Sequence, residues 1–220
     1  MRIIAIAAAA LVALAAVGPG ATQVQAQEGN GTLSVIHAAA GAPSVDVYVN
    51  GEVALSSRDF FSAGTIDLAP GYYEVRVVEE GASPDDVLVG KVVTVDENDA
   101  YTLALIGTTD GVRGLLLENS TSAPEAHEAR VRILHAATGT GPLDVALADS
   151  EPFLDDAVFG TATYIDMPAG TYALDLASSE GEALLRTVDL TFNAGWTYTL
   201  VVTGASGEDV WVQATVDRQP

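Results

Sequence analysis

Two histidine–aspartate pairs are the residues whose types and spacing could support chemistry in this sequence. His37 precedes Asp46 by nine positions, and the same spacing separates His135 from Asp144. A histidine beside a carboxylate could act as a general base or supply part of a metal site. Either role requires the two side chains of a pair to converge, so their use depends on the elements that position them.

The two pairs occupy equivalent points of an internal duplication. "LSVIHAAAG" matches "VRILHAATG", "SVDVYV" matches "PLDVAL", "TIDLAPGYYEVRV" matches "YIDMPAGTYALDL", and "AYTLALIGT" matches "TYTLVVTGA". The repeated unit is far longer than those of solenoid proteins, so it indicates two copies of one domain. We predict domains over residues 31–118 and 130–217, joined by a polar linker over residues 119–129.

Alternation of apolar and polar residues predicts β-strands in both copies, for example over residues 45–49, 73–77, 172–176 and 198–202. Such a period of two, with Val, Tyr and Thr enriched, is typical of half-buried strands. Turn residues separate about seven such strands per copy, as in antiparallel sandwiches. We therefore expect an all-β chain of two tandem immunoglobulin-like or transthyretin-like antiparallel β-sandwich domains, following a signal peptide.

Strand parity favours a structural role for the two pairs. His37 shares a face with the apolar Val35, whereas Asp46 lies opposite the apolar face of its own strand; His135 and Asp144 repeat this pattern. We interpret the histidines as hydrogen-bonded to loop backbone and the aspartates as acceptors of backbone N–H groups. The alternative is a hydrolase or a metal-dependent enzyme that uses a strand-end histidine.

The turns "PGYY" and "PAGTY" carry a second repeated feature. Gly71 and Gly170 are expected to adopt a conformation closed to residues with a Cβ. Tyr73 and Tyr172 share parity with the apolar residues that follow them. Their rings should therefore pack in the core, with the hydroxyl reaching a partner at its edge.

These motifs together resemble the domain-of-unknown-function family 4397, whose members are exported, often tandem, β-rich bacterial and archaeal domains. The first copy carries the resemblance in Val35-Ile36-His37-Ala38, Pro43, residues 45–49 and Pro70-Gly71-Tyr72-Tyr73. The second copy departs from it at Ala146, where the first has Tyr48, and at Asp149, where a turn Asn-Gly would sit. The resemblance implies the domain type and export, and it implies no catalytic residues.

The charge of the chain restricts its partners. Thirty acidic residues stand against nine basic ones, giving a formal net charge of −21. Nucleic acid and anionic membrane surfaces need a positive face, so both are excluded as partners. Dispersed acidic residues with the single lysine Lys91 suit the solvated coat of a salt-adapted, halophilic secreted protein, because salt screens the repulsion.

Calcium binding by clustered carboxylates is the alternative use of this charge. Asp96, Glu97 and Asp99 lie in one turn and could form an oxygen cage. The matching turn of the second copy, "FNAGWT", has no carboxylate. We therefore expect solvated acidic turns, no metal and no cofactor.

Trp196 and Trp211 are candidates for a ligand platform, because exposed aromatic rings can stack on a sugar or a peptide. The alternative for both is packing between the domains or under a loop. Asn30 and Asn119 begin glycosylation patterns at domain edges, where we expect them to be accessible. Motifs for nucleophilic catalysis are missing, and the sequence contains no cysteine.

Residues 1–26 have the order of a signal peptide: Arg2, an apolar run over residues 3–17, and small residues ending at Ala26. We expect a mature protein that is secreted or at the cell surface, or periplasmic in a host with two membranes, without membrane insertion. Its expected role is a non-enzymatic binding, adhesion or envelope-structural module with an extracellular or cell-surface ligand. The ligand, and whether the domains pack together, stay open at this stage.

Overall fold

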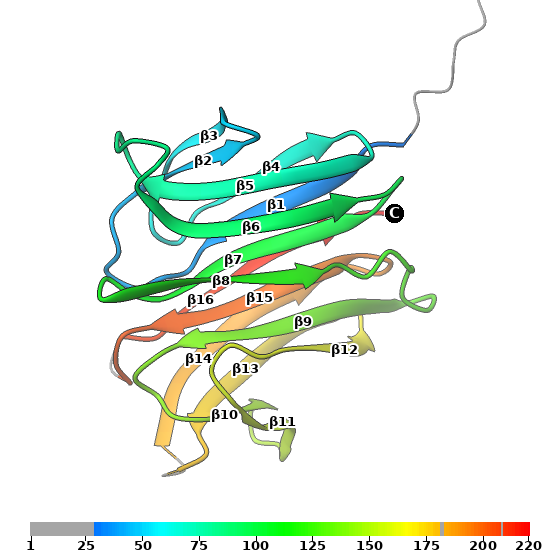
Figure 1. Ribbon diagram of the computed structural model, residues 1–220. Coiled ribbons are helices and arrows are strands. Elements are labelled where there is room, and N and C mark those ends of the chain that lie inside the picture. The colour runs from blue at the N-terminus through cyan, green and yellow to red at the C-terminus, as the bar shows by residue number, and fades with distance from the viewer. Residues whose placement is uncertain (1–28, 181–182, 208) are drawn as a thin grey trace, which may run out of the picture.

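The computed structural model describes residues 29–180, 183–207 and 209–220 and is built from β-strands (Figure 1). The first half of the chain forms one β-sandwich and the second half forms another, which confirms the predicted fold class. The described residues contain no helix that is long and apolar enough to cross a membrane. The predicted signal peptide, residues 1–26, lies outside the described residues.

In the described residues each sandwich has eight strands. Those of the first are β1 (Gly31–His37), β2 (Val45–Val49), β3 (Glu52–Arg58), β4 (Ala63–Leu68), β5 (Gly71–Glu79), β6 (Val87–Val95), β7 (Ala100–Thr108) and β8 (Gly111–Glu118). Those of the second are β9 (Glu128–Ala137), β10 (Leu143–Leu147), β11 (Pro152–Ala157), β12 (Ala162–Pro168), β13 (Gly170–Ser178), β14 (Ala183–Phe192), β15 (Thr197–Gly204) and β16 (Trp211–Arg218).

The two sandwiches share one topology. In the first, an inner sheet of order β4-β1-β7-β8 packs on an outer sheet of order β3-β2-β5-β6. In the second, the inner sheet is β12-β9-β15-β16 and the outer sheet is β11-β10-β13-β14. Each copy has one strand more than the expected number of about seven, and the expected antiparallel pairing dominates all four sheets; the exceptions are β1, which pairs parallel with β7, and β9, which pairs parallel with β15. A parallel pair needs a long crossover, which the outer-sheet strands supply, and alternation alone does not reveal strand partners.

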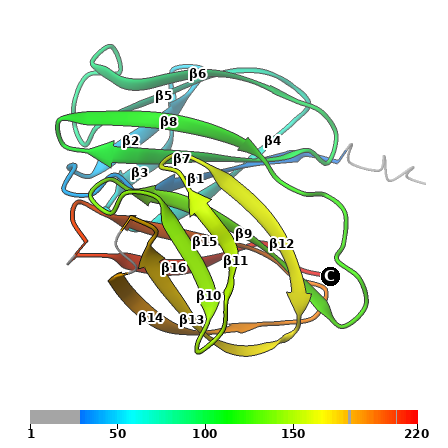
Figure 2. The same cartoon turned by 90° about the horizontal axis from the view of Figure 1, so that it is seen from below.

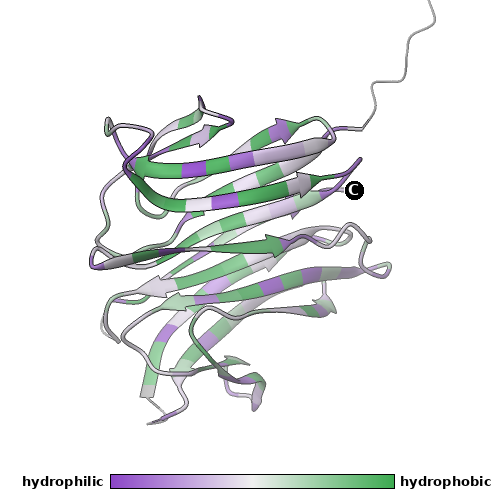
Figure 3. Cartoon of the chain, viewed as in Figure 1, coloured by the Kyte–Doolittle hydropathy of each residue, from purple (hydrophilic) through white to green (hydrophobic). Residues whose placement is uncertain are grey.

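Alternate residues of each strand fill the core of its own sandwich. Leu33, Val47, Val77 and Leu103 are fully buried in the first core, and Ile133, Val145, Leu176 and Leu200 occupy the second. Figure 3 shows hydrophobic residues recurring along the strands of both sandwiches. This burial is the main favourable term that holds each pair of sheets together.

The inner sheets also pack against each other, so that the molecule has four stacked layers (Figures 1 and 2). The contact surface, here called the seam, is an apolar cluster of Ile36, Ala38, Ala104, Ile106, Leu134, Ala136 and Val201. The Thr203 hydroxyl crosses the seam and donates to the carbonyl oxygen of Ala38 at 2.6 Å. Strands β1, β7, β9 and β15 are therefore buried on both faces.

A buried arginine anchors one end of the seam. Arg132 on β9 is 2% exposed. Its Nη2 atom donates to the hydroxyl of Thr199 in the same sheet at 2.8 Å and, across the seam, to the hydroxyl of Thr102 at 2.9 Å. Asp217 lies 3.4 Å from the same Nη2 atom. Burial raises the pKa of Asp217, although the charge of Arg132 and the Thr199 hydroxyl act in the opposite direction.

Candidate functional site

The two motif histidines make the same contact in each repeat. His37 Nε2 donates to the carbonyl oxygen of Pro43 at 2.9 Å, and His135 Nε2 donates to that of Gly141 at 2.9 Å. Both rings are 1% exposed. Nδ1 of His135 accepts the Ala137 N–H at 3.3 Å, which fixes a neutral ring. Burial lowers the pKa of His135, an effect that the bond to Gly141 partly offsets.

Asp46 clamps a β-bulge in the first sandwich. Val45 pairs with Arg58 and Val47 with Leu55, so two residues of β3 lie opposite Asp46. One of them, Ser57, has a φ of 52° and donates its N–H to Asp46 Oδ1 at 2.9 Å. Gly81 donates its N–H to Oδ2 at 3.0 Å, so both carboxylate oxygens are occupied by backbone.

Asp144 repeats this clamp in the second sandwich. The N–H of Asp156, whose φ is 51°, donates to Asp144 Oδ1 at 2.9 Å, and the Ser179 hydroxyl donates to the same oxygen. Within the described residues no hydrogen bond joins His37 to Asp46 or His135 to Asp144. The structure therefore places each pair in one loop region without bringing histidine and carboxylate together for proton transfer.

The motif tyrosines close a corner before β5 and β13. The Tyr73 hydroxyl donates to the Ala69 carbonyl at 2.7 Å, and the Tyr172 hydroxyl to that of Pro168 at 2.7 Å. The expectation that Gly71 and Gly170 adopt a conformation closed to residues with a Cβ was wrong, because neither has a positive φ. Each is the first residue of a strand and lies in the ladder, opposite Val95 or Phe192, where the backbone is extended.

The acidic turn after β6 is held by internal hydrogen bonds. Asp99 Oδ2 accepts the Asp96 N–H and the Tyr101 hydroxyl, both at 3.1 Å. Across the residues that the structure describes, which include Asp96, Glu97 and Asp99, no group of three or more His, Asp or Glu side chains could hold a metal ion. The arrangement is that of a capped turn.

The two tryptophans lie at opposite ends of one inner sheet. Trp196 precedes β15 and stacks on Tyr198, with ring centroids 6.0 Å apart. Trp211 begins β16 opposite Thr203 and is 49% exposed. Its ring meets the ring of Phe61 edge-on across the seam, with centroids 6.2 Å apart. The two rings do not form one platform.

The expected accessibility of Asn119 was wrong. Asn119 is 5% exposed, and its Oδ1 accepts the hydroxyl of Thr102 at 2.8 Å. Its glycosylation pattern lies at the edge of the first domain in the sequence, but the packed inner sheets cover that edge. Asn30, by contrast, is exposed.

An apolar cavity in the second sandwich was missed at the sequence level. It has a volume of about 380 Å³ and lies between the sandwich edges formed by β11 and β12. Its lining is Leu147, Phe153, Ile165, Asp166, Met167, Pro168 and Tyr172. The sequence feature that could have indicated this cavity is Phe153, a large aromatic residue on a short strand at the position where the first copy has Ala54.

Solved structures with some likeness to this chain have low identities. A family 26 carbohydrate-binding domain of Eubacterium rectale Amy13K, solved with maltoheptaose, is 13% identical over 87% of this chain and 98% of its own, with a TM-score of 0.26. A streptococcal virulence factor described by its α-glucan binding is 12% identical over 84% of this chain and 95% of its own, with a TM-score of 0.28. A putative adhesin of Bacteroides ovatus is 9% identical over 85% of this chain and 95% of its own, with a TM-score of 0.23. Values this low carry no argument about what the present chain binds.

No curated protein matches the chain. A family model does match it twice, over residues 31–146 and 131–220, and these two matches span nearly all of the described residues. The duplicated motifs and the two sandwiches of one topology agree with such a tandem match. The chain therefore belongs to the family described as a domain of unknown function, DUF4397.

Proposed function

We propose that this protein is a non-catalytic binding module of the cell exterior, serving adhesion or envelope structure, and that its second sandwich holds an apolar group of a ligand. The observation that carries the proposal is the apolar cavity between β11 and β12. Ligand sites are usually concave and mostly apolar, with few polar groups. The motif residues that could have supported chemistry are instead engaged with loop backbone.

The chemistry of the cavity favours a neutral, apolar ligand group. Its one charged lining residue, Asp166, is bonded to Arg130 through two contacts of 2.7 Å. The Arg130 guanidinium holds the pKa of Asp166 below its usual value, so the carboxylate stays ionised and paired. The Tyr172 hydroxyl is bonded to Pro168, which leaves its ring as the cavity wall.

The first sandwich provides an internal comparison. The strand registers of the two copies match Ala54 of the first sandwich with Phe153 of the second, and Val49 with Leu147. Met167 corresponds to Leu68, which is buried in the first sandwich. The smaller Ala54 cannot extend the wall as Phe153 does. The proposed binding site is therefore a property of the second copy rather than of the shared fold.

Export supports this role. The residue order of positions 1–26 is that of a signal peptide, and the charge of −21 suits a solvated surface facing an exterior medium. The chain has no cysteine, so its stability comes from its cores and its seam without disulfides. We place the mature protein outside the cytoplasm on these grounds.

Filling the cavity tests the proposal. Leu147→Trp should occupy it and reduce the fluorescence gain of the neutral apolar dye Nile red at least fivefold, because the dye loses its apolar contacts. The matched control is Val49→Trp at the equivalent strand position of the first sandwich, which should leave dye binding unchanged. Equal dye binding by wild type and Leu147→Trp, with both proteins folded by circular dichroism, would contradict the proposal.

A further inference from the structure

The seam has an approximate two-fold symmetry that makes its two outer ends comparable. Each inner sheet contributes the turn before its edge strand and the start of its last strand. At one end, Phe61 before β4 stacks on Phe60 and faces Trp211 of β16. At the other end, Phe159 and Gly160 before β12 face Arg113 of β8.

The two turns are built alike. Phe61 donates its N–H to the His37 carbonyl at 2.7 Å, and Gly160 donates to that of His135 at 2.8 Å. The rings of Phe60 and His37 meet edge-on with centroids 6.2 Å apart, and those of Phe159 and His135 do the same at 6.1 Å. Phe61 and Gly160 therefore occupy the same position of the same turn.

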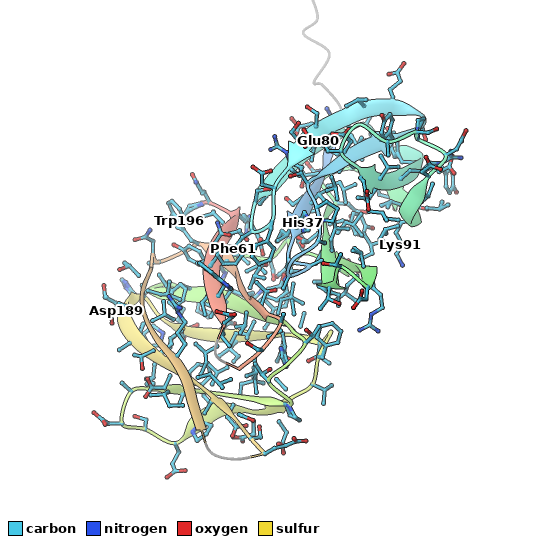
Figure 4. All side chains as sticks on the ribbon, turned by 90° about the vertical axis from the view of Figure 1, so that its left-hand side faces the viewer. His37, Phe61, Glu80, Lys91, Asp189 and Trp196 are labelled. Carbon is cyan, nitrogen blue, oxygen red and sulfur yellow. The ribbon has the colours of Figure 1, made fainter. Side chains whose placement is uncertain are left out.

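The backbone of Phe61 is strained, whereas that of its counterpart Gly160 is not. Its φ is 65°, a left-handed conformation that a bulky residue rarely adopts, whereas Gly160 has a φ of 82° at no steric cost. Strain of this kind persists when the surroundings determine it. The Phe61 ring stacks on Phe60 and meets the ring of Trp211 in the other sandwich, with centroids 5.7 Å and 6.2 Å apart, so a phenyl ring bridges the two sandwiches at this end of the seam. Figure 4 labels Phe61 where the two sandwiches meet.

The opposite end holds a cavity in place of that phenyl ring. It measures about 210 Å³ and is lined by Ile106, Arg113, Gly114, Leu115, Phe159 and Gly160. A Cβ added to Gly160 would lie 3.5 Å from Ile106 Cδ1, an ordinary contact distance. A side chain at this position would thus point toward the cavity, as Phe61 points toward Trp211.

Arg113 gives this end a positive charge at the position where the other end has Trp211. Its ladder position opposite Ile106 corresponds to that of Trp211 opposite Thr203. Cζ of Arg113 lies 4.8 Å from the centroid of the Phe159 ring, so one face of the guanidinium is stacked on the ring. The N–H groups at the edge of the guanidinium remain available. Among the described residues Arg113 has no salt-bridge partner, in a chain with thirty acidic side chains.

We infer that this end of the seam binds a small aromatic carboxylate, with its phenyl ring in the cavity beside Gly160 and its carboxylate on Arg113. Phe61 shows which group fits such a site, because it fills the equivalent space from within the chain. A carboxylate can accept two parallel N–H bonds from a guanidinium, which is the geometry that Arg113 offers.

The test uses 3-phenylpropionate as the probe, titrated into the full chain and followed by calorimetry, with 3-phenylpropanol as the uncharged comparison. The acid should bind at least tenfold more tightly than the alcohol, because only the acid forms the charge-assisted bonds. Arg113→Gln should remove most of this preference. This substitution lies at an exposed position, so it should leave folding intact.

A self-plugging variant tests the cavity itself. Gly160→Phe copies Phe61 and should abolish binding of both probes, whereas Leu147→Trp in the other cavity should leave binding unchanged. If Gly160→Phe does not fold, Leu115→Trp fills the same cavity from β8 and should give the same loss. Equal binding of acid and alcohol to wild type, or undiminished binding by a folded plugged variant, would overturn the inference.

Discussion

At the scale of single residues, the motif side chains fasten backbone. His37 and His135 hold the loop between the first two strands of each sandwich, and Asp46 and Asp144 cap the bulge of the neighbouring strand that lies opposite them. A bulge leaves one residue outside the ladder, and its N–H must find another acceptor. The carboxylate supplies that acceptor, which explains why a charged residue recurs in an otherwise apolar strand.

His135 should make stability depend on pH. Its folded-state pKa is lowered by burial from 6.5, so the unfolded state binds more protons in the window just below that value. Its contribution to the free energy of unfolding is therefore complete above pH 6.5 and is lost as the pH falls toward the lowered value.

His135→Gln keeps a donor for Gly141 and should flatten this acid-side slope. The measurement is urea unfolding between about pH 5 and pH 8, spanning the ordinary histidine range. His127→Asn, at an exposed position, serves as the control and should keep the wild-type slope. A slope unchanged by His135→Gln would show that other groups cause the pH dependence.

At the scale of elements, the four central strands differ from the rest because both their faces are covered. Alternation describes a strand with one solvated face, as in residues 73–77 of β5. In β1, β7, β9 and β15 the apolar residues run together, as in "ALIG" and "LVV". Continuous apolar runs are typical of strands buried on both sides, so these runs carried a signal for the seam.

Arg132 is a buried charged residue within these strands, and its removal should be costly. Arg132→Met leaves Asp217 as a buried carboxylate without its cation, which typically costs about 3–5 kcal/mol. The pKa of Asp217 is already raised above 3.8 by burial, so its contribution is most favourable below that pH and is lost as the pH rises. The loss in Arg132→Met should accordingly be larger at neutral than at acidic pH.

A double-mutant cycle checks the origin of this effect. Adding Asp217→Asn to Arg132→Met removes the unpaired charge and should recover part of the stability lost, as measured by denaturant unfolding. Arg130→Met breaks an ion pair at a more exposed position and should cost no more than about 1 kcal/mol. Strictly additive effects of the Arg132 and Asp217 substitutions would rule out their coupling.

At the scale of the whole molecule, the seam makes one body of two sandwiches. Lys91 on β6 and Asp189 on β14 belong to the two outer sheets, on opposite sides of the molecule (Figure 4). The inner sheets are joined by an apolar cluster, by the Arg132 network and by the Thr203 hydroxyl bond. An interface this apolar should couple the unfolding of the two halves.

We therefore expect a single calorimetric transition for the wild type, with equal calorimetric and van't Hoff enthalpies. Ala104→Arg places a charge in the seam, where Ala104 is fully buried, and should split this transition into two. Val92→Arg, at a position that is 72% exposed on the outer sheet, should leave one transition. Two transitions in the wild type would contradict the coupling.

The sequence by itself determined the all-β class, the duplication and the strand faces of the motif residues. These follow from local periodicity and from repeated motifs, such as the one around His37, which need no knowledge of distant partners. The structure alone decided the parallel pairing of β1 with β7, the burial of Asn119, and the meeting of Phe61 with Trp211. Each of these depends on which distant strands lie side by side, and no local pattern of residues encodes that choice.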